Sequence, residues 1–336
     1  MERRAVTETF GRGDRIEGSL IGGAIGDALG AATEFESLSS IRRLFGLDGL
    51  TDFATAYGAE GRFTDDTQMT LFTAEGLIRA VDDTDRVVSI WQAYLRWLGT
   101  QSGRSDGSVS GLAAEAVLRQ LRAPGNTCLG ALRGGVPGTV AEPVNDSKGC
   151  GGVMRVAPVG LVASNRVEAW ELGCAAAALT HGHPSGWAPA GAFAVMVWSL
   201  CEGGSLPEGI AAGRDALADE PAAGEALAWL DRGITLGTSG CLDAEGIDAF
   251  GQGWTGDEAL AIAVACVLAE PDPHQCLLLA VNHSGDSDST GSIVGQMLGA
   301  AHGPHAFARQ WRERVEAADL LVRVAADLHA LVVDEK

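Results

Sequence analysis

The chain has 336 residues, a formal net charge of −20 at pH 7 and an aromatic content of only 6%. The acidic charge argues against extended binding of nucleic acid, because such binding needs a basic surface that displaces counterions. It leaves open that a modified nucleic-acid end enters a pocket. The longest apolar stretch, residues 188–201, is too short to span a membrane, and the N-terminus lacks the apolar core of a secretory signal.

The seven cysteines are scattered along the chain and form no Cys-x-x-Cys pair. Their odd number and irregular spacing favour reduced thiols in the cytoplasm over a disulfide framework or a zinc site. No linker-like or low-complexity tract separates two parts of the chain. We therefore predict a single domain over residues 1–336, with a flexible start over residues 1–13.

Helical periodicity dominates the sequence. Bulky apolar residues recur at helical spacing over residues 87–98, 111–121, 257–268 and 318–328, whereas alternating β-branched runs are scarce. The pattern predicts an all-α fold, a single large bundle of about a dozen or more helices. Loops are expected over residues 99–107, 124–148 and 236–256.

Glycine recurs at every fourth position in two segments. These are Gly18, Gly22, Gly26 and Gly30 near the N-terminus, and Gly291, Gly295 and Gly299 near the C-terminus. On a helix this spacing produces a groove without side chains along one face. Because glycine costs a helix about 1 kcal/mol relative to alanine, the pattern needs a compensating contact. We predict that the two helices cross in near contact; the alternative is that the glycines pack under bulky neighbours elsewhere.

Two short segments combine carboxylates with hydroxyl groups. Thr64, Asp65 and Asp66 stand at a predicted helix start, and Asp286, Asp288 and Ser289 stand in a turn before the C-terminal glycines. Capping alone could explain the first segment, since hydroxyls and carboxylates stabilise a helix N-terminus. Together the six side chains offer enough oxygen ligands for two Mg²⁺ or Mn²⁺ ions bridged by a shared carboxylate. Four carboxylates without a metal would repel one another strongly.

Five motifs, taken as a set, carry a family resemblance. In chain order they are Gly26-Asp27-Ala-Leu-Gly30 with Glu34-Phe35, Phe63-Thr64-Asp65-Asp66-Thr67, Gly149-Cys-Gly-Gly-Val-Met154-Arg155, Thr180-His181-Gly-His183-Pro184 and Gly285-Asp286-Ser-Asp288-Ser289-Thr290-Gly291. They resemble the ADP-ribosylglycohydrolase family, which includes dinitrogenase-reductase-activating glycohydrolase and the vertebrate ADP-ribosylhydrolases. The family usually has threonine at positions 287 and 289, where this chain has serine.

The resemblance implies an orthogonal all-α bundle with two Mg²⁺ or Mn²⁺ ions, cleaving the bond between ribose C1″ of ADP-ribose and an acceptor. By motif match, the metal ligands would be Thr64, Asp65, Asp66, Asp286, Asp288 and Ser289. The candidate catalytic carboxylates are Glu34, Asp65 and Asp66, which could exchange protons with a water and the leaving group. Glu34 matches a mobile glutamate of some ADP-ribosylhydrolases; without that match, a solvated carboxylate at a helix end would be the plainer interpretation.

A second set of residues is expected to contact ADP-ribose. The set is Gly149, Gly151, Gly152, Met154, Arg155, His181 and Trp254. A glycine-lined turn over residues 148–155 can bring backbone amides close to a pyrophosphate. Arg155 could instead form a buried ion pair, and His181 could be structural. Trp254 could cover the adenosine or simply pack in the core.

The sequence therefore predicts a metal-dependent hydrolase that releases ADP-ribose from an ADP-ribosylated protein or small conjugate. One alternative is a non-catalytic ADP-ribose-binding or crystallin-like relative, and another is a two-metal nucleotide phosphohydrolase. By family analogy, Glu34 favours an O-linked conjugate over the arginine conjugate. The loops over residues 99–107 and 124–148 are expected at the mouth of the pocket. No sequence feature indicates the oligomeric state.

Overall fold

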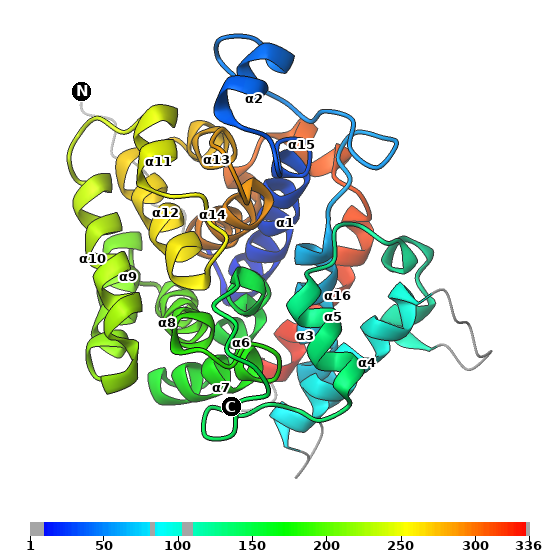
Figure 1. The fold of residues 1–336 in the computed structure, drawn as a ribbon. Helices are drawn as coiled ribbons and strands as arrows, with labels where there is room; N and C mark the ends of the chain where they lie inside the picture. Colours follow the sequence, from blue (N-terminus) through cyan, green and yellow to red (C-terminus); the bar gives the residue numbers. More distant parts are fainter. Residues whose placement is uncertain (1–9, 81–84, 103–109, 334–336) are drawn as a thin grey trace, which may run out of the picture.

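The computed structural model describes residues 10–80, 85–102 and 110–333. Within these ranges the chain is all-α and forms no strand, as the periodicity predicts (Figure 1). The α-helices are α1 (Arg12–Gly30), α2 (Leu38–Phe45), α3 (Asp65–Arg79), α4 (Arg86–Gln101), α5 (Asn126–Gly134), α6 (Ala157–Val162), α7 (Arg166–Ala178), α8 (Pro184–Cys201), α9 (Leu206–Ala218), α10 (Gly224–Gly237), α11 (Ala244–Phe250), α12 (Gly256–Ala269), α13 (Pro273–Val281), α14 (Ser287–His302), α15 (Arg309–Arg314) and α16 (Ala318–Val333).

Short 3₁₀ helices connect several of these elements. They are Gly111–Ala114, Ala116–Arg119, Cys150–Gly152, Pro221–Ala223 and Pro304–Ala306. The buried apolar side chains of the described residues form one continuous cluster that runs through the whole bundle.

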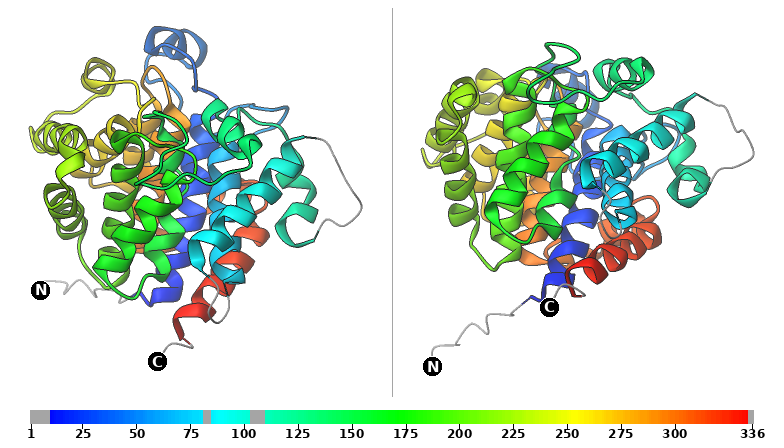
Figure 2. Two further views of the ribbon diagram at one scale, coloured as in Figure 1. Left: turned by 60° about the horizontal axis from the view of Figure 1, so that its bottom comes forward. Right: turned by 90° about the horizontal axis from the view of Figure 1, so that it is seen from below.

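Helices α1 and α14 form the central pair of the bundle, and the two glycine stripes face each other between them (Figures 1 and 2). A methyl group added at Gly22 would overlap the carbonyl oxygen of Gly295, and one added at Gly299 would overlap the carbonyl oxygen of Gly18. The predicted near contact is therefore confirmed. The contact joins segments that lie about 270 residues apart in the sequence and fixes how their ends meet.

The remaining helices cover this pair on two sides. Helices α3 and α16 pack against α1, whereas α8, α12 and α13 pack against α14 (Figure 2). Since α3 and α14 each begin at an acidic segment, their packing on the central pair decides where those two segments lie.

Three of the four predicted helices form as expected, within α4, α12 and α16. The helix predicted over residues 111–121 is wrong, because the chain forms two 3₁₀ helices separated by Glu115, whose backbone is extended at φ −69° and ψ 121°. Gly111 also has a φ of +66°, and the Leu112 amide donates to the Glu75 carboxylate at 3.2 Å. This tertiary contact holds the start of the segment against α3, which periodicity alone does not predict.

Two expected loops contain helices. Helix α5 lies within residues 124–148 and α11 lies within residues 236–256. Of the third expected loop, 99–107, residues 99–101 belong to α4 and residues 103–107 lie outside the described part. The flexible start expected over residues 1–13 overlaps the first turn of α1, where Arg12 donates to the Ala163 carbonyl at 3.0 Å. Arg12 and Gly13 thus belong to α1, and residues 1–9 lie outside the described residues.

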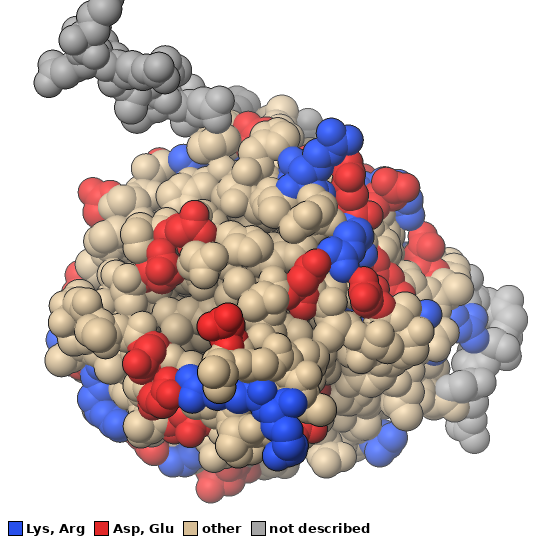
Figure 3. Space-filling model, turned by 90° about the horizontal axis from the view of Figure 1, so that it is seen from above, with Lys and Arg blue, Asp and Glu red and all other residues tan. Residues whose placement is uncertain are grey.

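The surface and the cysteines fit the expectations from composition. In the part of the chain that the structure describes, no helix combines the length and apolar character needed to cross a membrane. All seven cysteines are free thiols. On the face shown in Figure 3, Lys and Arg side chains lie beside Asp and Glu side chains, so charges of both signs alternate there.

Candidate active site

The first half of the site lies at the N-terminus of α3. Thr64 is the N-cap residue, and its hydroxyl oxygen accepts a hydrogen bond from the Asp66 amide at 3.3 Å. Asp65 and Asp66 follow in the first turn, where the helix dipole favours negative charge. Both carboxylates are buried and line a cavity. Helix capping therefore explains the presence of Thr64. It does not explain why Asp65 and Asp66 line the cavity.

The second half lies at the N-terminus of α14. Asp286 is the N-cap residue, with Asp288 and Ser289 in the first turn. The Asp286 amide donates to the Gln252 carbonyl at 2.8 Å, which ties this turn to the loop before α12. On the other side, a side chain at Gly30 of α1 would overlap the Asp288 backbone. The glycine contact between α1 and α14 thus brings Asp288 next to the end of α1.

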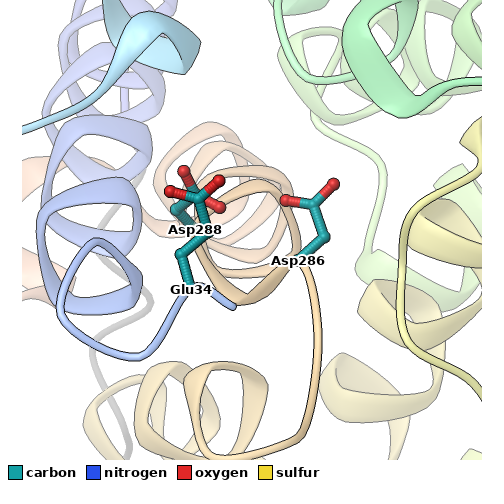
Figure 4. A group of neighbouring side chains, drawn as sticks. All are labelled: Glu34, Asp286 and Asp288. Atoms are coloured by element: carbon teal, nitrogen blue, oxygen red, sulfur yellow. The ribbon is translucent and has the colours of Figure 1, made fainter. Parts of the chain in front are cut away.

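Glu34 completes the cluster from the turn that follows α1. Figure 4 shows Glu34 beside Asp288, with Asp286 facing them from the start of α14. One carboxylate oxygen from each of these three residues lies within 4.8 Å of the others. The next residue, Phe35, has a φ of +66°, and its amide donates to the Gly285 carbonyl at 3.1 Å. These contacts hold the Glu34 turn against the start of α14.

The electrostatics of the cluster are those of crowded, buried carboxylates. Burial raises the pKa of Asp65, Asp66 and Asp286 well above the ordinary value, and the neighbouring Asp288 charge raises each of them further. Burial and then Asp288 raise the pKa of Glu34 in the same way. No lysine or arginine lines the cavity among the described residues. Among the described residues, the cavity beside the cluster therefore receives no positive charge from a lysine or arginine in its lining.

Several oxygens in the cluster have no hydrogen-bond donor. Glu34 Oε2 and Asp66 Oδ2 are buried and unpartnered, which is costly unless a cation or a ligand reaches them. Carboxylate and hydroxyl oxygens are the ligands that Mg²⁺ and Mn²⁺ prefer. The donor set, its burial and its unpartnered atoms therefore fit a divalent cation.

The two acidic segments meet in an open cavity of about 480 Å³. Its lining residues are Phe35, Asp65, Asp66, Ala123, Pro124, Gly125, Asn126, Thr127, Cys128, Gly149, Cys150, Gly151, Met154, His181, Trp254, Asp286 and Ser289. A second cavity of about 340 Å³ shares Asn126 and Thr127 with the first and continues along α5. The lining residues from Pro124 to Cys128 belong to the segment that the sequence analysis expects at the pocket mouth.

The glycine-lined turn divides between the cavity and the packed interior behind it. Gly149, Gly151 and Met154 line the cavity. Gly152 is not among the lining residues, and a side chain there would meet Ala177 of α7 and the Gly186 carbonyl of α8. Gly152 therefore permits close packing of the turn on α7 and α8.

Arg155 is also placed differently from the prediction. Its side chain is fully buried, its guanidinium lies 4.3 Å from the centre of the Tyr94 ring, and it does not line the cavity. Among the described residues it has no carboxylate partner, so the buried ion pair is wrong as well. Its Nη2 donates to the Thr180 hydroxyl at 2.7 Å, and Thr180 Oγ1 lies 2.8 Å from His181 Nδ1.

The surroundings of His181 determine both the charge and the tautomer of its ring. Burial and then the Arg155 charge lower the pKa of His181 to about 3, so its ring is neutral near neutral pH. Since the Thr180 oxygen accepts from Arg155, its own hydrogen can be donated to Nδ1; the other acceptor, Ala177 O, is 3.5 Å away. The ring hydrogen then sits on Nε2, which faces Gly149 and Gly151. His181 thus presents a donor to the cavity.

Trp254 lies at the mouth of the cavity. Its ring stacks on Phe35 with centroids 5.4 Å apart and an interplanar angle of 22°, and its Nε1 donates to Gln252 at 3.0 Å. The Cys150 amide donates to the Trp254 carbonyl at 3.2 Å. The tryptophan is partly exposed rather than packed in the core, and it connects the Glu34 turn to the glycine-lined turn.

Two residues without a role in the sequence analysis contact predicted metal ligands in the structure. The Cys150 thiol donates to Asp286 Oδ2 at 2.7 Å, and Asp27 of α1 accepts three hydrogen bonds from residues 64–67. A signal for Asp27 exists in the sequence, since a carboxylate inside a glycine-rich, buried helix needs a partner. Cys150 had no such signal.

A helical bundle with an acidic cluster beside an open cavity defines a class: an all-α protein with a group of carboxylates that could hold a metal ion next to that cavity. The family model described as ADP-ribosylglycohydrolase matches residues 9–336. The chain belongs to the ADP-ribosylglycohydrolase family. Membership confirms the resemblance of the five motifs and supports hydrolysis of ADP-ribose conjugates as the general activity.

The similarity to individual relatives extends over most of both chains. The uncharacterised protein YegU of Escherichia coli (strain K12) is 28% identical over 92% of this chain and 93% of its own length. ADP-ribosyl-[dinitrogen reductase] glycohydrolase of Rhodospirillum rubrum is 25% identical over 90% of each. ADP-ribosylhydrolase ARH3 of Mus musculus is 24% identical over 94% of this chain and 91% of its own.

A solved structure shows the same fold. An "ADP-ribosylglycohydrolase-related protein complex" superposes with a TM-score of 0.67 and 24% identity, covering 96% of this chain and 99% of that one. The orthogonal bundle implied by the resemblance is thus confirmed for the fold.

Proposed function

We propose that this protein hydrolyses the glycosidic bond between ribose C1″ of ADP-ribose and an acceptor, and that the reaction depends on Mg²⁺ or Mn²⁺. The observation that carries the proposal is the convergence of Asp65, Asp66 and the start of α14 on one cavity. Glu34 lies beside Asp286 and Asp288, and buried oxygens of Glu34 and Asp66 lack a donor. Thr64, Asp65, Asp66, Asp286, Asp288 and Ser289 are the residues proposed to hold two ions. When bound, the ions would supply positive charge for the ribose hydroxyls and for activation of a water.

Side chains of the protein would perform the proton transfer and stabilise the developing charge. Glu34 carries an unpartnered oxygen, Oε2, and sits on a turn held by Phe35 and Gly285. This oxygen is our candidate for moving a proton between the attacking water and the leaving group. Asp65 and Asp66 are the other candidates. The same carboxylates would stabilise the positive charge that develops at C1″ during cleavage.

The cavity offers a place for each part of ADP-ribose. With the distal ribose at the acidic cluster, the diphosphate would meet the backbone of Gly149 and Gly151 and the Nε2 hydrogen of His181. Trp254 would cover the nucleotide from the mouth, together with Phe35. The adjoining cavity along α5 provides further length for an elongated ligand.

The direct test is release of free ADP-ribose from defined conjugates of arginine, serine, an acetyl ester, a nucleobase and poly(ADP-ribose). We expect release with Mg²⁺ or Mn²⁺, no release with a chelator, and loss of release in Asp288→Ala. The conjugate that is cleaved fastest identifies the acceptor class; the Glu34 match favours an O-linked conjugate.

Two rival functions give different products. A non-catalytic ADP-ribose-binding relative would bind the conjugates tightly and release nothing. A two-metal nucleotide phosphohydrolase would split the diphosphate and yield AMP and an acceptor that still carries a ribose phosphate, instead of intact ADP-ribose. Separation of the products by chromatography therefore distinguishes all three.

The free thiols support a cytoplasmic location for the enzyme.

A further inference from the structure

We propose that Asp27 is a positioning residue: as a carboxylate of α1, it fixes the first turn of α3 so that Asp65 and Asp66 meet Asp286 and Asp288. The inference concerns the metal site and in that sense rests on the proposed function. Asp27 is fully buried and lies between Gly26 and Gly30 of the glycine stripe.

The hydrogen bonds of the Asp27 carboxylate all run to the start of α3. Asp27 Oδ1 accepts from the Thr64 amide at 2.8 Å. Asp27 Oδ2 accepts from the Thr67 amide at 2.9 Å and from the Thr67 hydroxyl at 2.5 Å. Both oxygens are therefore occupied by donors from one turn of α3. Asp27 is thus engaged by the protein, in contrast to Asp66, whose Oδ2 has no partner.

These contacts change how the N-terminus of α3 is capped. The Asp66 amide donates to the Thr64 hydroxyl, and the Asp65 amide donates to the Arg122 carbonyl at 3.2 Å. With Thr64 and Thr67 donating to Asp27, the amides of residues 64–67 all have acceptors. The carboxylates of Asp65 and Asp66 are therefore not needed to cap their own helix and can face the cavity.

The same stretch of α1 contacts the other half of the site. A side chain at Gly26 would overlap the Gly291 carbonyl, and one at Gly30 would overlap the Asp288 backbone. Within one turn, α1 thus bonds to the start of α3 through Asp27 and lies against the start of α14 through its glycines. The relative position of the two acidic segments is set by this single turn of helix.

A carboxylate is required at this position because all of its partners are donors. Asparagine has nearly the same shape, but its NH₂ group would face either the Thr64 amide or the Thr67 amide and hydroxyl. The mismatch would move the first turn of α3 and with it Asp65 and Asp66. Loss of such an orienting contact typically weakens metal binding by about 10- to 100-fold.

The test is Mn²⁺ titration of the full-length protein, followed by electron paramagnetic resonance, for the wild type, Asp27→Asn and Thr67→Val. We expect Asp27→Asn to weaken Mn²⁺ binding by about 10- to 100-fold. Thr67→Val removes only the hydroxyl donor and should weaken binding less. Hydrolysis by Asp27→Asn should recover as Mn²⁺ is raised, since the ligands themselves are intact.

Glu75→Gln is the matched control, because Glu75 is also a buried carboxylate of α3 but pairs with Arg79 and Arg96 away from the cavity. It should lower thermal stability and leave Mn²⁺ affinity within about twofold of the wild type. Wild-type affinity in Asp27→Asn, or an equal loss in Glu75→Gln, would overturn the proposal. If Asp27→Asn does not fold, Thr67→Val decides alone: unchanged Mn²⁺ affinity in that variant refutes the role. A wild type that binds no Mn²⁺ would instead refute the proposed metal dependence as a whole, and this inference with it.

Discussion

Asp288 is the residue whose charge acts on most of the site. It is buried at the start of α14, and its charge raises the pKa values of Asp27, Glu34, Asp65, Asp66 and Asp286. Without a cation this is mutual repulsion, which disfavours the folded state; with a cation it becomes part of the ligand set. The Asp288 charge therefore favours cation binding but lowers the stability of the metal-free protein.

We predict that Asp288→Asn lowers the activity but raises the stability of the metal-free protein. Release of ADP-ribose should fall by about 100-fold or more, because loss of charge stabilisation worth several kcal/mol corresponds to at least two powers of ten in rate. In a chelator, the melting temperature of the variant should rise above that of the wild type. Asp231→Asn, which removes a charge paired with Arg214 on the surface, serves as the control and should change neither property appreciably. A lower melting temperature of Asp288→Asn in the chelator would contradict the account of repulsion.

A second prediction at the residue scale concerns Thr180. Thr180→Val keeps the volume but removes the hydroxyl between Arg155 and His181, so Nδ1 loses its donor and the ring hydrogen is no longer directed to Nε2. We expect ADP-ribose to bind about tenfold more weakly, which corresponds to one lost hydrogen bond of about 1.4 kcal/mol. Thr73→Val, which removes a buried hydroxyl bonded to Tyr94, should destabilise the fold while leaving ADP-ribose affinity unchanged. Calorimetric titration with ADP-ribose checks both, and equal affinity in the two variants would refute the role of Thr180.

At the scale of helices, the contact between α1 and α14 has an unusual consequence for mutation. Glycine to alanine normally stabilises a helix, yet a methyl group at Gly295 would overlap the Gly22 backbone. We predict that Gly295→Ala lowers the free energy of unfolding by about 1–3 kcal/mol or more, as overpacked core positions do. Gly99→Ala in α4, where added atoms meet nothing within 4 Å, should instead raise it by up to about 1 kcal/mol. Urea denaturation of both variants measures the difference, and a stabilised Gly295→Ala would disprove the near contact.

The same scale shows what periodicity can and cannot predict. The segments at α4 and α16 form helices whose apolar residues lie on one buried face, whereas α12 is apolar and buried on nearly all sides. The segment at 111–121 has the same spacing, but Glu75 from α3 binds its first amide and Glu115 is extended. Helix α5 was missed for the opposite reason, since glycines at 130 and 134 weaken its pattern while Cys128 and Leu132 are buried against the core. Local sequence does not contain these tertiary contacts.

At the scale of the whole molecule, the site could be predicted as two acidic segments but not as one geometry. The types and spacing of Asp65, Asp66, Asp286 and Asp288 indicate oxygen ligands, and the glycine stripes indicate which helices meet. The role of Arg155 required the structure, because burial behind the cavity is a property of the packed α7 and α8 layer. The role of Asp27 likewise depends on where α3 begins relative to α1.

The whole molecule should also show how strongly metal and protons are coupled. In the metal-free folded protein, the pKa values of five clustered carboxylates are raised: those of Glu34, Asp65, Asp66 and Asp286, and that of Asp27, which is about 7. Above the pH range in which carboxylates ordinarily ionise, the folded protein therefore binds more protons than the unfolded chain. Its free energy of unfolding therefore falls as the pH rises. The histidines with lowered pKa values, His181, His283 and His302, act in the opposite direction, but only below their ordinary value of 6.5, so they do not contribute above pH 7. Buried thiols such as Cys150, whose pKa is also raised, add to the fall only near their ordinary value of 9.0.

We accordingly predict that the melting temperature in a chelator decreases between about pH 7 and pH 9, and that saturating Mn²⁺ raises it by more at the higher pH. The reason is that the cation takes the place of protons on the clustered carboxylates, so its binding must release protons where those groups are still protonated. Thermal scans with and without Mn²⁺ test the first part, and calorimetric titration in two buffers of different ionisation enthalpy counts the released protons. In Asp288→Asn both the pH dependence and the proton release should shrink. A melting temperature that rises with pH in the chelator, or a Mn²⁺ effect that is the same at both pH values, would show that the carboxylates are not coupled in the way their burial requires.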